Sequence, residues 1–338
     1  MNGGEALLFG DINIDSFWPV VEFPKPGRDG IVDNVKFEVG GAILNSAVEL
    51  DRLGMRVRLL GCVGEDIWAE QILKELSKTH IALSSIQKVK NAITGINFTI
   101  VTPDGERTMF THRGANVFLR PEMLDHSIFQ NARILHMSGY ALLEKPQSKS
   151  AWKAIELAKK YGFPISLDTG LEPVMKQPQD FHRLLKELTV CISGLEEMNL
   201  LLGTTTPEEG LEKLIEIGVC LAAIKLGKKG SLIATREHIL YTPSFNVDTV
   251  DSTGAGDSFS AGVLYGWLNG FELEMTATLA SALGALATTV YGAGFSLPSK
   301  DALVKFLCEE TDYPAAFMAE SAKQLVAHFR QSGKRIVE

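Results

Sequence analysis

The 338-residue sequence contains four cysteines, which stand far apart and form no CxxC pair. Neither a zinc cluster nor a disulfide framework is therefore indicated. Apolar residues flank each of them, and the four positions are Cys62, Cys191, Cys220 and Cys308. We expect all four to be buried, reduced thiols.

Long apolar runs and clusters of basic residues are missing as well. No run approaches the roughly 18 apolar residues that a membrane-spanning helix needs. The start, MNGGEALLFGDINID, lacks the basic segment and long apolar core of a secretory signal. The formal charge of −8 argues against a nucleic-acid partner, although a small anion could still bind at a locally positive site. We expect a cytoplasmic protein with no membrane or nucleic-acid partner.

The composition, with 45% apolar and 22% charged residues, is typical of a folded chain of one large domain or two. Strand-like runs alternate with segments of helical periodicity. The predicted strands are 6–10, 56–63, 133–137, 164–167, 190–192 and 221–225, and the predicted helices are 43–53, 66–78, 148–161, 207–217, two between 257 and 289, and 317–329. This alternation predicts a parallel sheet covered on both faces, with ligands beyond the carboxyl ends of its strands.

One segment breaks the alternation. GINFTIV (95–101) alternates apolar and polar residues, TPDGE supplies a turn, and RTMFTHR (107–113) continues as a second strand. A β-hairpin inside an α/β protein is often a lid or an oligomer interface. A surface hairpin without function fits the pattern equally well.

The segment DSTGAGDSF (251–259) combines glycines, a carboxylate and a predicted helix start. The first amides of a helix have no intrahelical acceptor, glycines admit a ligand close to the backbone, and the helix dipole favours an anion. Phosphoryl transfer needs positive groups around the moving phosphoryl group and a base for the attacking hydroxyl. Taken alone, a helix cap in a tight turn explains the segment equally well.

Two common nucleotide-binding motifs are absent. The Walker A pattern GxxxxGK[ST] occurs nowhere in the chain, and the dinucleotide fingerprint GxGxxG fails because Phe259 stands at its third glycine. A nicotinamide dehydrogenase is therefore disfavoured.

Three motifs resemble signatures of the ribokinase-like (PfkB) carbohydrate kinases. They are GDINIDS (10–16), VGGAILNSAVELDRLG (39–54) followed by GCVGEDIWAE (61–70), and TVDSTGAGDSFSAG (249–262). They occur in the family's order, and the resemblance covers residues 5–300. It implies a three-layer α/β/α sandwich with a large domain of residues 1–14, 38–91 and 116–338. It also implies a small, discontinuous β lid of residues 15–37 and 92–115.

The resemblance further implies an ATP-dependent kinase that phosphorylates a hydroxymethyl group of a sugar or sugar acid. Asp257 would be the general base, and the amides of Gly254, Ala255 and Gly256 would form the anion hole. The sugar would bind at Asn13, Asp15, Gly40, Gly41 and Asn45, with the glycine pair admitting its ring. Arg107 and Arg113 on the hairpin are either within reach of the substrate or, as is commoner, solvated strand charges. The nucleotide would bind at Lys225, Gly227 and Glu197, with adenine near residues 285–294, which include Gly292.

Metal ions are expected as well. Mg²⁺ accompanies ATP, and the resemblance implies a monovalent cation such as K⁺ at Asp251, Thr253 and Ser296. In SGLEEMN (193–199) Gly194 replaces the asparagine that, with Glu197, helps to organise hydrated Mg²⁺ in the family. Asp168 in LDTG is either a group that orders phosphate or water, or a turn cap.

Two alternatives stay open. A nucleoside kinase of the same family would add aromatic stacking from the lid, for which Phe17, Trp18, Phe98 and Phe110 are available. A catalytically silent sugar-binding regulator would have no use for a base at Asp257. By family analogy, and because an exposed sheet edge favours pairing, the lid could also form a homodimer.

Overall fold

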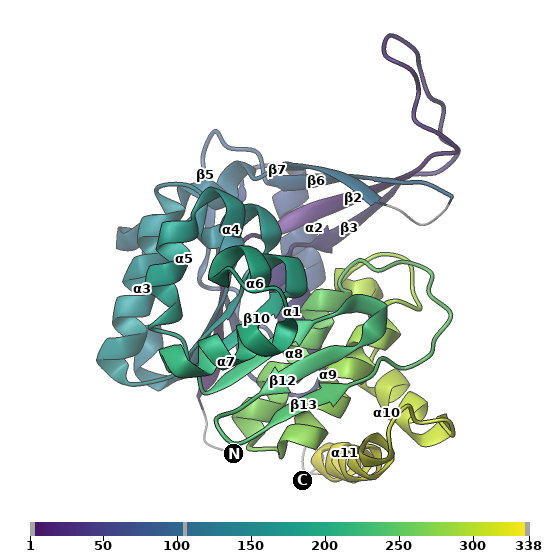
Figure 1. Ribbon diagram of the computed structural model, residues 1–338. Coiled ribbons are helices and arrows are strands. Elements are labelled where there is room, and N and C mark those ends of the chain that lie inside the picture. The colour runs from purple at the N-terminus through teal and green to yellow at the C-terminus, as the bar shows by residue number, and fades with distance from the viewer. Residues whose placement is uncertain (1–3, 104–106, 335–338) are drawn as a thin grey trace.

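The computed structural model describes residues 4–103 and 107–334, and its centre is a nine-stranded sheet (Figure 1). Its strands are β1 (Glu5–Phe9), β4 (Val57–Gly64), β5 (Ile86–Val89), β8 (Ala132–Ser138), β9 (Ile165–Asp168), β10 (Val190–Gly194), β11 (Leu221–Lys225), β12 (Ser231–Ala234) and β13 (Ile239–Thr242). The order is β13-β12-β11-β10-β9-β8-β1-β4-β5. Neighbours from β11 to β5 are parallel, and β12 and β13 add an antiparallel edge. The mostly parallel sheet is thus confirmed.

Helices cover both faces of this sheet. One layer contains α1 (Ala42–Arg52), α2 (Ile67–Leu76), α8 (Ala255–Asn269), α9 (Leu273–Ala287), α10 (Lys300–Glu309) and α11 (Ala316–Lys334). The other contains α3 (Gln147–Tyr161), α4 (Leu171–Lys176), α5 (Pro178–Leu185), α6 (Leu195–Leu202) and α7 (Pro207–Ile217). Successive side chains of a strand point to opposite faces, and those of β1 are apolar on both faces. Ala6 and Leu8 pack against the first helix layer, Leu7 and Phe9 pack against the second, and all four are fully buried. The three-layer arrangement is confirmed.

A second, four-stranded sheet lies at one end of the large one (Figure 1). Its order is β3 (Lys36–Gly40), β2 (Asn13–Pro19), β6 (Gly95–Val101) and β7 (Arg107–His112). The predicted hairpin supplies β6 and β7, and this small sheet fits the expected lid. Because β2 begins at Asn13 and β3 ends at Gly40, the sheet reaches into segments assigned to the large domain, whose boundaries stay a prediction.

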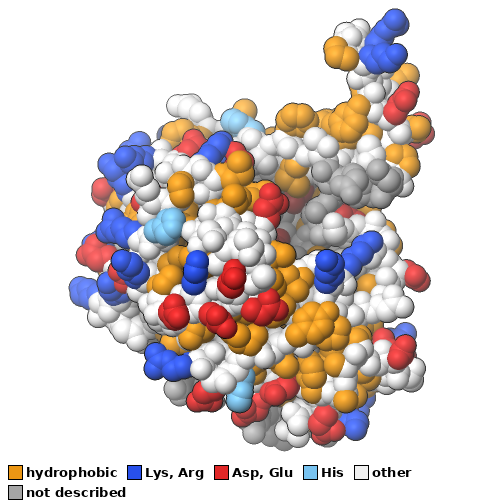
Figure 2. All heavy atoms as spheres, viewed as in Figure 1, with side chains coloured by type: hydrophobic (Ala, Val, Ile, Leu, Met, Phe, Trp, Pro, Cys, Tyr) orange, Lys and Arg blue, Asp and Glu red, His pale blue; other side chains and the backbone are white. Residues whose placement is uncertain are grey.

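The connection from β2 to β3, residues 20–35, projects away from the rest of the molecule (Figures 1 and 2). Its apolar side chains are strongly exposed, with Val21 at 87% and Ile31 at 95%. The exposed Lys25 and Arg28 lie near its tip. This arm therefore contributes little to the core.

Most predicted elements lie within two residues of the observed ones. The last helix runs on to Lys334, and it buries the apolar positions predicted to pack on the body, namely Met318, Ala322, Leu325, Val326 and Phe329. Short 3-10 helices η1 (Gly114–Phe118), η2 (Pro121–Met123), η3 (His126–Asn131), η4 (Gly139–Leu142), η5 (Gly227–Lys229) and η6 (Gly294–Ser296) complete the fold. In the described ranges no helix is long and apolar enough to cross a membrane.

The prediction of four buried cysteines is wrong for two of them. Cys62 and Cys191 are buried, and burial raises the pKa of each thiol to about 12. Cys220 and Cys308 are exposed. Apolar neighbours in sequence do not decide burial, since the residue after Leu307 on a helix points about 100° away from it.

Candidate active site

The predicted functional residues come from the carboxyl ends of parallel strands, from helix starts and from the small sheet. Asp168, Gly194 and Lys225 end the neighbouring strands β9, β10 and β11. Asp257 lies in the first turn of α8 and Asp15 lies on β2. Segments from the whole length of the chain thus converge where a parallel sheet binds its ligands.

The carboxylate of Asp257 is held from α1. Helix α8 begins at Ala255 after Gly254, whose φ of +76° favours glycine. Asn45 Nδ2 donates to Asp257 Oδ2 at 2.6 Å, and Ser46 Oγ donates to the Asp257 carbonyl at 3.1 Å. The structure therefore joins the predicted base to a predicted sugar-binding residue 212 positions away.

Asp15 is a deeply buried carboxyl group on the small sheet. Burial raises its pKa to about 7, and the nearby charges of Asp257 and Glu38 act in the same direction. Asn97 Nδ2 donates to Asp15 Oδ1 at 2.7 Å and opposes this shift. Asn97 belongs to no motif, and only its polar place in the alternating strand GINFTIV marks it.

Gly40 and Gly41 allow close packing between the small sheet and its neighbours. A Cβ on Gly40 would lie 2.0 Å from Asp15 Oδ2, so this carboxylate fills the space beside Gly40. Gly41 has a φ of +102°, and its Cβ would lie 2.5 Å from the carbonyl oxygen of Asp11. The pair thus allows close packing around Asp15, and its part in admitting a sugar ring stays a prediction.

The remaining residues of this side have mainly protein partners. Asn13 Oδ1 accepts from Asn116 Nδ2 at 2.8 Å, and no motif pointed to Asn116. Arg113 is 9% exposed and pairs with Asp11 at 2.8 and 2.9 Å, so it is neither a solvated strand charge nor free for a substrate. Arg107 begins β7, but its side chain lies outside the described part of the structure.

A groove of about 490 Å³ lies on the other side of the α8 start. Lys225, Gly227, Ala255 and Gly256 line it, together with residues of 244–249 and of α9. Among the described residues, those lining the groove do not include Gly292. The predicted nucleotide residues Lys225 and Gly227 thus meet the predicted anion hole, whereas Gly292 lies elsewhere.

Lys225 brings a positive charge to the first turn of α8. Its Nζ lies 2.8 and 2.9 Å from the carboxylate oxygens of Asp168, and a Cβ on Gly256 would lie 3.4 Å from it. Burial alone would lower the pKa of Lys225, but the carboxylates of Asp168 and Glu197 raise it above its usual value. Ser260 Oγ donates to Asp168 Oδ2 at 2.7 Å. Asp168 is therefore the partner of a cation rather than a simple turn cap.

The departure at Gly194 has a visible consequence. Glu197 folds back over the start of α6, where its Oε2 accepts from Gly194 N at 2.7 Å and from Thr169 Oγ1 at 2.5 Å. A Cβ on Gly194 would lie 3.0 Å from Glu197 Oε1. Within residues 4–103 and 107–334 no group of three or more His, Cys, Asp or Glu side chains is arranged to hold a metal. A single carboxylate here suits Mg²⁺ carried by substrate phosphates.

The side chains expected to bind a monovalent cation have protein partners. Asp251 Oδ1 accepts from the amide and hydroxyl of Thr253 at 2.9 and 2.7 Å, and Oδ2 accepts from Gly292 N at 3.0 Å. Ser296 Oγ donates to Glu38 Oε1. These groups hold the loop after α9 in place.

The aromatic residues considered for nucleoside stacking do not face Asp15. Asp15 pairs in register with Asn97, and side chains alternate between the faces of a sheet. Trp18, Phe98 and Phe110 therefore lie on the opposite face, with Trp18 and Phe98 ring centroids 4.9 Å apart. Phe17 shares the face of Asp15 but is fully buried, 5.5 Å from the ring of Tyr291.

Comparison with known proteins agrees with this geometry. Residues 5–300 match the family described as pfkB family carbohydrate kinase. The chain belongs to this family. It is therefore a phosphotransferase that uses ATP and acts on a sugar hydroxyl group.

Individual relatives cover most of the chain. A 5-dehydro-2-deoxygluconokinase from Clostridium perfringens is 28% identical over 84% of this chain and 88% of its own length. The protein named probable fructokinase-2 from Arabidopsis thaliana is 29% identical over 79% and 86%. The crystal structure of ribokinase from Thermotoga maritima aligns with a TM-score of 0.77 at 25% identity, over 90% of this chain and 99% of that chain.

Proposed function

We propose that this pfkB carbohydrate kinase transfers the γ-phosphoryl group of ATP to a hydroxymethyl group of a sugar or sugar acid. The observation that carries this proposal is the carboxylate of Asp257, held by Asn45 at 2.6 Å beside the amides of the α8 start. A base and an anion-binding helix end thus meet at one point.

In the proposed mechanism Asp257 accepts the proton of the attacking hydroxyl. The amides of Gly254, Ala255 and Gly256 bind the oxygens of the transferred phosphoryl group, where fixed donors lower the barrier most. Lys225 lies against Gly256 and adds a full positive charge to this hole. Asp168 keeps the ammonium of Lys225 in place.

The sugar would bind on the face of the small sheet that carries Asp15. The carboxyl group of Asp15 and the amides of Asn13, Asn45 and Asn97 can each pair with hydroxyl groups. Arg107 stays a candidate for an acidic group of the substrate. By their names, one relative acts on a sugar acid and another on fructose, which supports a sugar or sugar acid as substrate.

ATP would occupy the groove between Gly227 and α9, with its phosphates toward Lys225. Mg²⁺, when bound, would neutralise phosphate charge, and Glu197 is the carboxylate that we expect to face its water shell. Gly292 as a nucleotide contact, and K⁺ at Asp251, Thr253 and Ser296, stay predictions. So do the cytoplasmic location and a homodimer.

A nucleoside acceptor is the weaker alternative. It needs an aromatic platform next to the acceptor hydroxyl, and Trp18, Phe98 and Phe110 lie on the wrong face of the small sheet for this. A silent regulator is disfavoured by the hydrogen-bonded Asp257.

The test is ADP release across a panel of sugars, sugar acids and nucleosides, with Mg²⁺ and K⁺ present. Asp257→Asn should lower the turnover of the accepted sugar by about 10²–10⁴. Asp301→Asn is the matched control, because Asp301 is an exposed aspartate in the first turn of α10, and it should behave as wild type. Full turnover in Asp257→Asn would overturn the mechanism. Sugar binding without turnover in the wild type would establish the regulator instead.

A further inference from the structure

Three consecutive backbone amides after α9 donate to three side chains from different parts of the fold. Gly292 N binds Asp251 Oδ2 at 3.0 Å, Ala293 N binds Glu38 Oε2 at 2.7 Å, and Gly294 N binds Asn45 Oδ1 at 3.0 Å. These amides belong to loop 291–296. The loop therefore joins the irregular segment before α8, the small sheet and α1.

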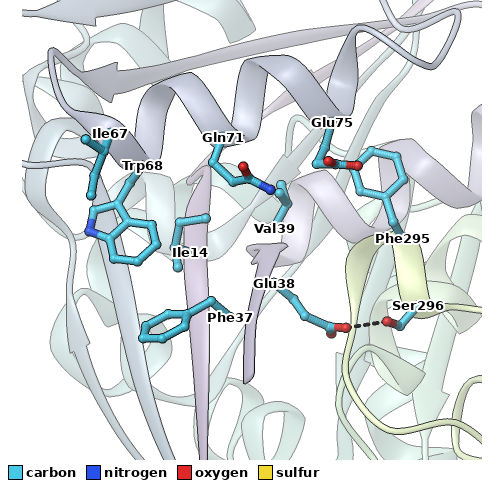
Figure 3. A pocket seen from close by; sticks show the side chains of 10 residues that line it. All are labelled: Ile14, Phe37, Glu38, Val39, Ile67, Trp68, Gln71, Glu75, Phe295 and Ser296. Carbon is cyan, nitrogen blue, oxygen red and sulfur yellow. Dashed lines mark hydrogen bonds between the residues drawn. The ribbon is translucent and has the colours of Figure 1, made fainter. Parts of the chain in front are cut away.

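Glu38 is one of two side chains of β3, with Lys36, that join the small sheet to this loop. Its side chain is 10% exposed, and besides Ala293 N its carboxylate accepts from Ser296 Oγ, as the dashed line in Figure 3 shows. Lys36 pairs with it at 2.5 Å and donates to the Tyr291 carbonyl at 2.9 Å. Glu38 and Ser296 also line a cavity of about 430 Å³. Figure 3 shows the side chains around this cavity.

The loop is shaped to receive this carboxylate. A Cβ on Gly292 would lie 1.8 Å from Glu38 Oε2, and Gly292 has a φ of +103°. A side chain there would collide with Glu38 and strain the backbone. The glycine therefore allows the carboxylate to lie directly against the loop.

Asn45 connects this loop to Asp257, the proposed base. The amide of Asn45 presents its oxygen to Gly294 N, so its NH₂ group points the other way and donates to Asp257 Oδ2. If the amide of Asn45 were reversed, its NH₂ group would face the N–H of Gly294, and two hydrogen-bond donors would meet. Gly294 N thus holds the oxygen of Asn45 in the place from which the NH₂ group of this side chain reaches Asp257.

We propose that Glu38 is a positioning residue for phosphoryl transfer, which acts by holding loop 291–296 so that Asn45 orients Asp257. The proposal rests on the proposed function, in which Asp257 is the base. Glu38 pairs in register with Asp15 on β2, so the predicted sugar-binding strand and the loop contact belong to one pair of adjacent strands. A displacement of the small sheet therefore moves the sugar site and loosens the base together.

The test compares two substitutions of Glu38. Glu38→Ala removes both loop contacts and should lower kcat by about 10–100-fold, since a misplacement of about 1 Å in a site costs about 10²-fold. Glu38→Gln can still accept from Ala293 N and donate to Ser296 Oγ, and it should retain most of the wild-type kcat. The KM for ATP should stay within about twofold in both, because the ATP groove lies on the other side of α8. Glu22→Ala, on the exposed arm, is the control.

Measurements in the Asp257→Asn background separate positioning from general damage. If Glu38 acts through Asp257, Glu38→Ala should add little to the loss already caused by Asp257→Asn. Wild-type kcat in a folded Glu38→Ala, equal damage in the Gln and Ala variants, or full additivity with Asp257→Asn would each overturn the proposal. Should Glu38→Ala fail to fold, Glu38→Asp keeps the charge but is too short to span both contacts, and the same kcat loss is expected. Undiminished turnover in Asp257→Asn would instead overturn the proposed function.

Discussion

Glu49, like Asp15, is a buried carboxyl group that makes the stability of this protein depend on pH. The residue lies on α1 with 2% of its side chain exposed, and its Oε1 has no hydrogen-bond partner in the described structure. Arg52 lies 3.6 Å away and favours the charged form. Burial is the larger effect and raises the pKa of Glu49 to about 7. The folded protein therefore holds this proton when the unfolded chain has already released it.

This raised pKa gives a stability prediction. Between the unfolded pKa of 4.5 and about 7 the native state binds the additional proton, so the free energy of unfolding falls as pH rises through that window. Glu49→Gln should unfold with about 1–3 kcal/mol more free energy at pH 8 and show a flatter profile below pH 7. Urea unfolding at pH 5 and pH 8 measures both. Glu216→Gln, an exposed control, should leave the profile unchanged, and equal stabilities of Glu49→Gln and wild type at pH 8 would contradict the prediction.

Gly194 gives a second prediction at this scale. A Cβ at this position would crowd Glu197 Oε1 at 3.0 Å, so Gly194→Asn should push the carboxylate off the start of α6. Losing this cap should cost about 0.5–2 kcal/mol of stability. The released carboxylate and the added amide should together lower the Mg²⁺ concentration needed for half-maximal turnover.

A Mg²⁺ titration of ADP release measures this effect. Gly194→Ala introduces the same Cβ without the amide, and it should lose stability without gaining as much Mg²⁺ affinity. An identical Mg²⁺ dependence in all three proteins would show that Glu197 does not take part.

At the scale of elements, a substitution at Gly256 can separate the contribution of the α8 start to stability from its proposed contribution to phosphate binding. A Cβ on Gly256 would lie 3.4 Å from Lys225 Nζ, which is ordinary contact, and alanine favours a helix over glycine by about 1 kcal/mol. Gly256→Ala should therefore be at least as stable as wild type. Its methyl group would nevertheless stand in the groove where the phosphates approach, so the KM for ATP should rise by roughly tenfold and kcat should fall. The melting temperature, kcat and KM for ATP of Gly256→Ala, measured on one preparation, test both expectations. Unchanged kinetics would exclude this groove as the phosphate site.

Elements with strong periodicity, including the hairpin that forms β6 and β7, could be predicted from the sequence, whereas β2 and β3 of the small sheet could not. The helices around 43–53 and 207–217 have an apolar face, and β1 and β11 are short apolar runs. NIDSFWP, which forms β2, mixes polar and apolar residues without regular alternation, and KFEVG, which forms β3, has only five residues. The former is defined by its pairing with β6, about 80 residues away. Such long-range pairing leaves no local trace in the sequence.

At the scale of the whole molecule the same limit applies to the site. The motif around Asp257 could be recognised because its parts are neighbours in the chain. Glu38 and Ala293 are 255 positions apart, and their contact depends on how the small sheet lies against loop 291–296. Residues such as Asn97 and Glu38 become visible only when both sheets are in place. The sequence could therefore predict the chemistry of the site better than the contacts that orient it.

The outer face of the small sheet leads to a prediction about assembly. Phe110 on β7 is 62% exposed, and Phe37 on β3 is 48% exposed although its ring stacks on Trp68 of α2; both lie on the face opposite Asp15. Exposed aromatic side chains on one face of a sheet are typical of an interface. We therefore expect the wild type to sediment as a dimer, with Phe110→Lys shifting it to a monomer because the interface would have to bury a charge.

The control has to carry the same change on a different sheet. Ile239→Lys lies on the edge strand β13 of the large sheet, where the isoleucine is 45% exposed, and it should leave the dimer intact. Since Phe110 is mostly in solvent in the single chain, Phe110→Lys should keep the wild-type melting temperature at concentrations where both proteins are monomers. A wild type that sediments as a monomer, or a Phe110→Lys variant that still dimerises, would remove this face from consideration. If the monomer also loses kcat, the interface holds the small sheet in place, because this sheet carries both Asp15 and the Glu38 contact to loop 291–296.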